Sequence, residues 1–329
     1  MIKEKIIIIG AGPCGLSAAI ELKEKGYDPL VIERGNVVNA IYHYPTHQQF
    51  FSTSEKLAIG GIPFYSTERK PKRNEALVYY REVVREKNVR IHAFEEVREV
   101  TKQENGTFSL RTQKNKQEKR YEASYVIVAT GYYDSPNYMN VPGEKKPHVL
   151  HYFKEAHPYF DQDVCVIGGK NSAVDAALEL DKAGARVTVL YRGSEYSKSV
   201  KPWILPEFDG LVKKEQIKMV FDTTIDEITD NDVIYSEKGQ QHKLRADFVF
   251  AMTGYHPDHS FIRKMGVHTD SSTGRPDFNP ETMETNCEGI YIAGVIAAGN
   301  NANEIFIENG RHHGTSIAQS IIKKEAGGV

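Results

Sequence analysis

The sequence is poor in cysteine and tryptophan, and its charges nearly cancel. Its 329 residues include three cysteines and one tryptophan, and 42 basic residues against 44 acidic ones give a formal net charge of −2. The cysteines, Cys14, Cys165 and Cys287, lie too far apart in the chain for a disulfide framework or a zinc site, so we expect no metal centre. A chain of near-neutral charge without a basic stripe is not expected to bind nucleic acid.

Long apolar runs are missing as well. No stretch approaches the roughly 20 apolar residues that a membrane-spanning helix needs, so we expect no membrane insertion. The apolar start of the chain, Ile6 to Ile9, is too short and wrongly flanked for a signal peptide. With 40% hydrophobic and 26% charged residues, the composition is that of a soluble globular protein, which we expect in the cytoplasm.

What the sequence does contain is two glycine turns of one kind, each directly after an apolar strand. The first, Gly10-Ala11-Gly12-Pro13-Cys14-Gly15, follows Ile6 to Ile9. The second, Gly168-Gly169-Lys170-Asn171-Ser172-Ala173, follows Val164 to Ile167. Each turn opens a helix that leads to a second strand, as in the β-α-β unit that binds a dinucleotide diphosphate at the helix N-terminus. Two such units indicate that a hydride passes between two dinucleotides, which predicts a flavoprotein supplied by a nicotinamide cofactor.

The residue after the second strand of each unit indicates which dinucleotide binds. Glu33 follows Leu30 to Ile32, about 20 residues after the first turn, where a carboxylate bonds ribose hydroxyls and disfavours a 2′-phosphate. The first unit therefore suits FAD. In the second unit we place Arg192 in the position of Glu33, and a cation there can pair with the 2′-phosphate of NADPH. A solvated charge at the strand end is the alternative for Arg192.

Lys170 departs from the usual glycine pattern. It stands where the middle glycine normally lets the backbone approach the diphosphate. Its ammonium group can contact a phosphate directly, so the dinucleotide interpretation is kept.

The rest of the chain gives coarser expectations. Residues 36–64 are irregular and aromatic, and we expect them to line the flavin, with a packed surface loop as the alternative. We expect a helix over residues 74–87, a hairpin turn at Asn105-Gly106 and a last helix from about Glu308 to Lys324. Cys165 lies inside an apolar strand and is expected in the core.

These motifs resemble those of a known family. Together with the two turns, the strand ends Ala129-Thr130-Gly131, Thr253-Gly254 and Gly289 to Gly294 look like those of the two-dinucleotide flavoprotein superfamily. The length is similar to that of the low-molecular-weight thioredoxin reductases. Within that group, both turns and the loop from Tyr42 to Ser54 resemble those of the bacillithiol disulfide reductases.

The resemblance implies an α/β fold of two Rossmann-like dinucleotide-binding domains. An NADPH-binding domain, residues 135–256, would be inserted into an FAD-binding domain made of residues 1–134 and 257–329. The implied cofactors are FAD and NADPH. The implied partner is a small-molecule disulfide, bacillithiol disulfide, and the implied assembly is a homo-oligomer.

The same resemblance implies which residues bind the two cofactors. For FAD these are Gly10, Gly12, Pro13, Cys14, Gly15, Glu33, Arg34, Thr130, Gly131, Gly294, Val295, Glu304 and Ile305. For NADPH these are Gly168, Lys170, Asn171, Ser172, Ala173 and Arg192.

Two positions depart from the thioredoxin reductase pattern. After the second turn, Val174-Asp175-Ala176-Ala177 stands in place of a Cys-x-x-Cys pair, so relay of electrons to thioredoxin is not expected. Val295 stands in place of the aspartate that usually bonds the ribityl chain of the flavin, so that contact must come from another group.

Cys14 is the candidate catalytic residue. It lies at a helix N-terminus, where the helix dipole lowers a thiol pKa, so the thiolate could attack the disulfide and form a mixed disulfide. A packing residue beside the FAD diphosphate is the alternative, and the sequence leaves both open.

Three other functions stay open. A ferredoxin or flavodoxin reductase would need a basic docking face, for which Lys70, Lys72 and Arg73 are candidates. A relative of the flavin monooxygenases would activate oxygen, and a redox-sensing protein would bind both cofactors without turnover. Because the sequence encodes a complete path for the hydride, we expect an enzyme.

Overall fold

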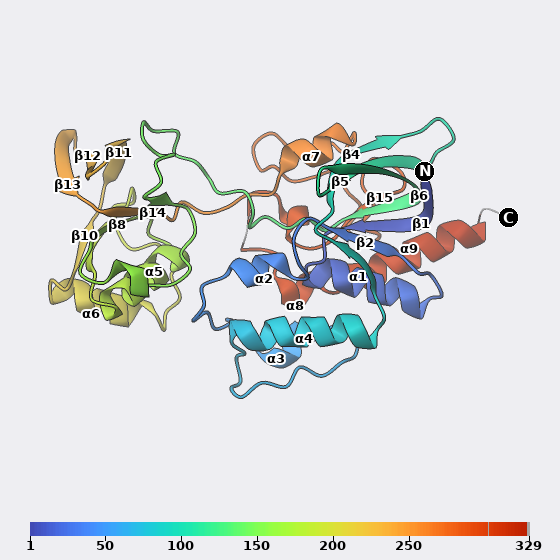
Figure 1. Ribbon diagram of the computed structural model, residues 1–329, viewed down its shortest axis with the longest axis horizontal. Helices are drawn as coiled ribbons and strands as arrows, with labels where there is room; N and C mark the ends of the chain where they lie inside the picture. Colours follow the sequence, from blue (N-terminus) through green and yellow to red (C-terminus); the bar gives the residue numbers. More distant parts are fainter. Residues whose placement is uncertain (302, 328–329) are drawn as a thin grey trace. The chain divides into compact units, whose positions relative to one another are not determined.

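A computed structural model describes residues 1–301 and 303–327, and the chain divides into two compact units. The first unit combines Met1–Ser135 with Tyr255–Val329, and the second is Pro136–Gly254. The chain therefore leaves the first unit after Ser135 and re-enters it at Tyr255 (Figure 1). Within the described part of the chain, no helix is long and apolar enough to cross a membrane.

The first unit is built on a seven-stranded sheet in the order β3-β2-β1-β6-β5-β4, with β15 also paired to β6. Its strands are β1 (Ile2–Ile9), β2 (Leu30–Glu33), β3 (Arg90–Ala93), β4 (Glu96–Lys102), β5 (Phe108–Lys114), β6 (Gln117–Val128) and β15 (Ile290–Ile292). β1, β2, β3, β6 and β15 run parallel, whereas β4, β5 and the first half of β6 form an antiparallel meander. Ile6, Ile7 and Ile8 are at most 1% exposed, as expected for a parallel strand covered on both faces.

The helices of the first unit are α1 (Pro13–Glu24), α2 (Asn39–His43), α3 (Ser54–Leu57), α4 (Arg73–Glu86), α7 (His259–Lys264), α8 (Ile307–Gly310) and α9 (His313–Gly327). A short 3₁₀ helix, η2, covers Val295–Ala298. The expected helix over 74–87 is confirmed as α4. α1 and α9 lie side by side against the sheet (Figure 1).

The expected last helix is present as α9, but it begins at His313 and not at about Glu308, because the chain turns at Arg311 and His312. The Ser17 hydroxyl donates to the Arg311 carbonyl over 2.7 Å, while the Thr315 N–H donates to the His312 carbonyl. The Arg311 side chain also donates to the carbonyls of Glu55 and Ala58. These contacts end α8 and start α9 anew at His313.

The second unit holds a parallel sheet in the order β10-β9-β8-β14-β7 and a three-stranded antiparallel sheet, β11-β12-β13. The strands of the two sheets are β7 (Val149–Leu150), β8 (Asp163–Ile167), β9 (Arg186–Leu190), β10 (Ile217–Val220), β11 (Thr223–Ile228), β12 (Asp232–Glu237), β13 (Gln240–Arg245) and β14 (Phe248–Ala251). The helices are α5 (Asn171–Lys182), α6 (Leu205–Lys213) and the 3₁₀ turn η1 (His157–Tyr159). Cys165 on β8 is fully buried, as predicted. The predicted α/β class with two Rossmann-like units is confirmed.

Candidate functional site

The first glycine turn joins β1 to α1, and two of its glycines are required by their surroundings. Gly10 has a φ of +110°, and a Cβ there would lie 2.5 Å from the Ala129 carbonyl oxygen. A Cβ on Gly15 would overlap the Gly10 carbonyl oxygen. Gly12 differs, because no atom lies within 4 Å of the place its Cβ would take. The turn is therefore tight against β6 and open at Gly12.

The open space at Gly12 adjoins the N-terminus of α1. Gly12 is the N-cap residue, no side chain caps the helix, and Pro13 occupies its start. The uncapped N–H groups and the positive end of the helix dipole favour an anion. This arrangement fits the diphosphate of a dinucleotide.

Glu33 connects the end of β2 to the first turn. Its carboxylate is only 9% exposed and accepts hydrogen bonds of 2.7 Å from the N–H groups of Ala11 and Gly35. Burial raises the pKa of Glu33, and the two backbone bonds work against that rise. Each carboxylate oxygen has a second lone pair with which to accept a ribose hydroxyl.

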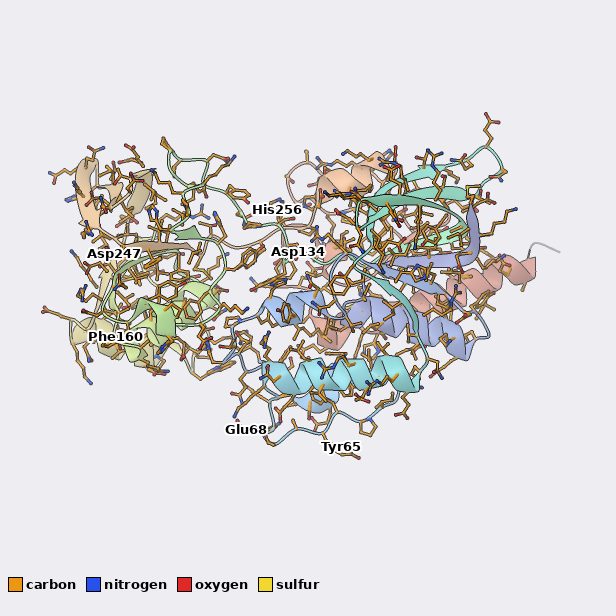
Figure 2. The ribbon with its side chains drawn as sticks, viewed as in Figure 1. Tyr65, Glu68, Asp134, Phe160, Asp247 and His256 are labelled. Carbon is orange, nitrogen blue, oxygen red and sulfur yellow. The ribbon has the colours of Figure 1, made fainter. Side chains whose placement is uncertain are left out.

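Arg34, the next residue, is engaged in an ion pair. Its guanidinium lies 2.7 Å from the carboxylate of Asp134, which is labelled in Figure 2. The side chains of both residues are more than one-third exposed. Arg34 thus lies beside the Glu33 end of the site, although its charge is already neutralised.

Three strand ends meet at the same edge of the sheet. Ile9 pairs with Val128, and Val128 pairs with Ile292, so the turns after β1, β6 and β15 are neighbours. The predicted residues Thr130 and Gly131 follow β6, with a φ of +71° at Gly131. Gly294 and Val295 follow β15, with a φ of +79° at Gly294, and Val295 begins η2. The structure therefore brings the predicted glycines of the first unit together.

Cys14 is the second residue of α1, and its sulfur packs against two glycines. A Cβ on Gly294 would lie 3.1 Å from Sγ, and a Cβ on Gly310 would lie 2.9 Å from it. Burial raises the pKa of Cys14 to about 12, which is opposite to the lowering expected from the helix dipole. Burial disfavours the charged thiolate, so the thiol is protonated at neutral pH.

Glu304 and Ile305 lie close to one another in sequence but have different surroundings. Glu304 is exposed and forms an ion pair with Arg275. Ile305 is half-buried, and a Cβ on Gly310 would lie 3.1 Å from its Cγ2 atom. Ile305 therefore lies near the sulfur of Cys14, and Glu304 faces a cation.

An aromatic cluster joins Tyr44 and Phe50, from the segment that the sequence marked as aromatic, to Tyr133 and Tyr255. Tyr44 contacts Phe50 and Tyr133, with ring centroids 6.1 Å and 5.1 Å apart, and Tyr133 contacts Tyr255 at 4.7 Å. Burial raises the pKa of Tyr44, so its phenol stays protonated. The aromatic composition of residues 42–51 was the available signal, but it did not show that Tyr133 and Tyr255 join them.

The second glycine turn joins β8 to α5 and repeats the first. Gly168 has a φ of +142°, and a Cβ there would lie 2.5 Å from the Met252 carbonyl oxygen. The same Cβ would lie 3.2 Å from the Cβ of Ala173, which takes the place of Gly15. Lys170 is exposed and is the N-cap residue of α5, without a side-chain capping bond. Ser172 is exposed in the first turn of α5.

The strand registers correct the predicted position of Arg192. Ile9 pairs with Ile32 and Ile167 pairs with Leu190, so Tyr191, not Arg192, corresponds to Glu33. Arg192 is exposed and corresponds to Arg34. The prediction was wrong by one residue because the strand end cannot be fixed to a single residue from the sequence.

Tyr191 covers the second turn. A Cβ on Gly169 would overlap the Tyr191 ring, and a Cβ on Gly193 would lie 2.5 Å from its Cε1 atom. The ring is thus packed between two glycines. The second unit has an aromatic ring where the first has a carboxylate, and no negative charge at that position opposes a 2′-phosphate.

Asn171 has a contact that the sequence did not reveal. Its amide donates to the Ser199 carbonyl over 2.9 Å and accepts from the Lys201 N–H over 2.9 Å. The side chain therefore fastens residues 199–201 to the start of α5. This segment is adjacent in sequence to Lys198 and includes Lys201, so Asn171 acts on the loop that carries these two cations.

Comparison with known proteins agrees with this geometry. Residues 7–294 match the family described as pyridine nucleotide-disulphide oxidoreductase. The chain is 65% identical, over 99% of both chains, to a protein of Bacillus subtilis named bacilliredoxin reductase Bdr.

Two solved structures named bacillithiol disulfide reductase Bdr (YpdA) are also similar. The Bacillus cereus protein is 63% identical, with a TM-score of 0.96, over 98% of this chain and 99% of that one. The Staphylococcus aureus protein is 57% identical, with a TM-score of 0.94, over 99% and 100%. The chain belongs to the pyridine nucleotide-disulphide oxidoreductase family.

Proposed function

We propose that the protein passes two electrons from NADPH through FAD to a low-molecular-weight disulfide, namely bacillithiol disulfide. The observation that carries the proposal is the pair of glycine turns at Gly10 and Gly168, each at the end of a parallel strand and each with a positive φ that favours glycine. The substrate follows from the relatives, since the B. cereus and S. aureus proteins are named for bacillithiol disulfide. Enzymes of this family use FAD and NAD(P)H.

The first unit is proposed to hold FAD, which accepts a hydride from NADPH and passes two electrons on when it is bound. The space at Gly12 and the N-terminus of α1 receive the diphosphate, and Glu33 accepts the ribose hydroxyls. Thr130, Gly131 and Gly294 line the same sheet edge. In this assignment, the FAD-binding part is residues 1–134 and 257–329, close to the observed first unit.

The second unit is proposed to hold NADPH. Its diphosphate would bind at the N-terminus of α5, where Lys170 supplies an additional positive charge. Arg192, two residues after β9, is exposed and would pair with the 2′-phosphate, and the neighbouring Tyr191 brings no negative charge that would oppose it. The NADPH-binding part is then residues 135–256.

Cys14 is proposed to attack the disulfide. Its sulfur would bond to one sulfur of the substrate and release the other as a thiol. Two electrons and two protons would then break the mixed disulfide, restore the Cys14 thiol and release the second thiol. In total, NADPH, one proton and one disulfide give NADP⁺ and two thiols. Because burial raises the pKa of Cys14 to about 12, the thiol must lose its proton as it attacks.

The structure weakens the ferredoxin reductase alternative. Arg73, one of the three cations expected in a basic docking face, is only 7% exposed and donates to the Tyr42 carbonyl. Lys72 lies 2.8 Å from the carboxylate of Glu68, which offsets its charge. An acidic protein would therefore meet little net positive charge at these two residues.

Anaerobic absorbance spectroscopy tests the proposed electron path. NADPH should bleach the flavin absorbance of the FAD-loaded protein, and bacillithiol disulfide should restore it. Failure of NADPH to bleach the flavin would refute the hydride step, and failure of the disulfide to restore the absorbance would refute the substrate.

We also propose a homo-oligomer located in the cytoplasm. The assembly is supported by the resemblance to the low-molecular-weight thioredoxin reductases. The location is supported by the similarity to the B. cereus and S. aureus proteins, which are named for the disulfide of a small thiol. Sedimentation velocity would refute the first part if the FAD-loaded protein behaved as a monomer. Fractionation of cells would refute the second if the protein were found outside the cytoplasm.

A further inference from the structure

His313 begins α9 and contacts the backbone at the end of β15. Its Nδ1 atom accepts a hydrogen bond from the Gly294 N–H over 3.1 Å. Burial lowers the pKa of His313, and nearby His312 lowers it further, so the imidazole is neutral at pH 7. A neutral ring that accepts at Nδ1 carries its proton on Nε2. The Gly294 bond therefore fixes both the ring and its tautomer.

The Nε2–H group donates no hydrogen bond to the described part of the protein. Across residues 1–301 and 303–327, His313 makes no hydrogen bond other than that with Gly294. The side chain is only half-buried, and its Nε2 atom is not sealed from solvent. Nε2 is therefore an oriented donor that a bound molecule can reach.

The location of His313 indicates which molecule that is. A Cβ on Gly294 would lie 3.0 Å from the Cβ of Cys14, so the His313 contact adjoins the first turn of α1. The uncapped start of that helix and the space at Gly12 fit a diphosphate. Val295, which follows Gly294, has no polar side chain. His313 thus supplies a side-chain donor where the loop after β15 has none.

We propose that His313 is an FAD-binding residue, whose Nε2–H donates to an oxygen of the segment that joins the adenosine of FAD to its ring system. This inference rests on the proposed function, because it requires FAD in the first unit. The acceptor is a phosphate oxygen or a ribityl hydroxyl, since these are the oxygens of that segment.

Titration of the apoprotein with FAD, followed by quenching of flavin fluorescence, tests the proposal. His313→Ala should weaken FAD binding about tenfold, the upper end of what one hydrogen bond contributes. His313→Gln should recover most of the affinity, because an amide can accept from Gly294 and still donate.

His312→Ala is the matched control. His312 is exposed and lies 3.3 Å from the Nε atom of Arg311, and its loss should change FAD affinity less than twofold. Circular dichroism and thermal melting of the apoproteins establish that each variant is folded. If His313→Ala fails to fold, His313→Phe, which fills the same space without a donor, is compared with His313→Gln instead, and equal FAD affinity of these two proteins would overturn the proposal.

Competition by ADP, which has a diphosphate but no ribityl chain, locates the acceptor. Weaker binding of both FAD and ADP by His313→Ala supports a phosphate oxygen, and weaker binding of FAD alone supports a ribityl hydroxyl. Unchanged FAD affinity in a folded His313→Ala protein overturns the inference and leaves the proposed function intact. A wild-type apoprotein that does not bind FAD would overturn both.

Discussion

The sulfur of Cys14 packs against Gly310 and fills the space that a side chain at position 310 would occupy. A Cβ on Gly310 would lie only 2.9 Å from Sγ. The contact joins the start of α1 to the end of α8, although the two elements are almost 300 residues apart in the sequence. Ser17 and Arg311, which share a hydrogen bond, are 294 residues apart. It places a thiol and a glycine in a close-packed junction beside the proposed FAD site. A change on either side should therefore affect the other.

Gly310→Ala should destabilise the protein, because its methyl group would overlap Sγ of Cys14. We expect a loss of about 1–3 kcal/mol, the usual cost of overpacking. Combining it with Cys14→Ala should recover part of the loss, because the smaller side chain frees the space. Denaturant unfolding of both single variants and the double variant measures this coupling. Additive losses would show that the two residues do not interact.

Cys14→Ala should abolish bacillithiol disulfide reduction while leaving NADPH-dependent reduction of ferricyanide, an artificial acceptor, nearly unchanged. Cys14→Ser should behave in the same way, because a hydroxyl is a poor nucleophile toward sulfur. Parallel assays with the two acceptors measure this. Retention of disulfide turnover by Cys14→Ala would assign the residue to packing alone.

The pH dependence of disulfide turnover should follow the Cys14 thiol. Its pKa is raised to about 12, so the thiolate fraction is small at neutral pH and grows about tenfold per pH unit up to that value. The rate of thiolate attack should therefore rise between pH 7 and 9, whereas ferricyanide reduction should not follow this rise. Single-turnover assays across this pH range measure it, and a flat profile for a step limited by attack would contradict a thiolate nucleophile.

The fold was largely predictable from the sequence, because both β-α-β units have apolar strands, glycine turns and helices in the expected spacing. The sheet edge that gathers Gly10, Thr130 and Gly294 follows from parallel pairing of those strands. α6 was not predicted, since Pro206 and Gly210 lie within it and weaken the helical pattern. The break at Arg311 could not be predicted either, because it depends on Ser17, which is distant in sequence.

The site was less predictable where side chains contact residues that are distant in the sequence. The helix dipole suggested a lowered pKa for Cys14, but the packing of Gly294 and Gly310 around its sulfur cannot be read from local sequence. The pairing of Arg34 with Asp134 and the contacts of Asn171 with residues 199–201 are also non-local. Such contacts can be identified only once the fold is known.

Gly12 and Gly15 should respond differently to the same change. Gly12→Ala should fold normally, because no atom lies within 4 Å of its Cβ position, yet its methyl group would enter the space proposed for the diphosphate. Gly15→Ala should destabilise the fold, because its Cβ would overlap the Gly10 carbonyl. Thermal melting and FAD titration of the two variants separate the effects. Normal FAD affinity of Gly12→Ala would place the diphosphate elsewhere.

Arg192→Gln should raise the KM for NADPH about tenfold and change the KM for NADH little, because only NADPH has the 2′-phosphate. Arg245→Gln is a matched control, since Arg245 is exposed on β13 of the same unit and pairs with Asp247. Steady-state assays with both nucleotides measure the preference. An equal rise in both KM values would remove Arg192 from 2′-phosphate binding.

Asn171→Ala should also raise the KM for NADPH, by about two- to fivefold, and leave kcat nearly unchanged. The loss of its two hydrogen bonds frees residues 199–201, which carry Lys201. Asn171→Asp keeps an acceptor for the Lys201 N–H and should have a smaller effect on the loop. If Asn171→Ala changed kcat and not KM, the side chain would have a role outside nucleotide binding.

NADPH oxidation by the FAD-loaded protein under anaerobic conditions tests the proposed reaction most directly. Bacillithiol disulfide, oxidised glutathione and ferredoxin are offered separately, and the thiols formed are counted. We expect turnover with bacillithiol disulfide, with two thiols formed for each NADPH consumed, and little turnover with the other two. No turnover with bacillithiol disulfide, together with reduction of ferredoxin, would contradict the proposed function.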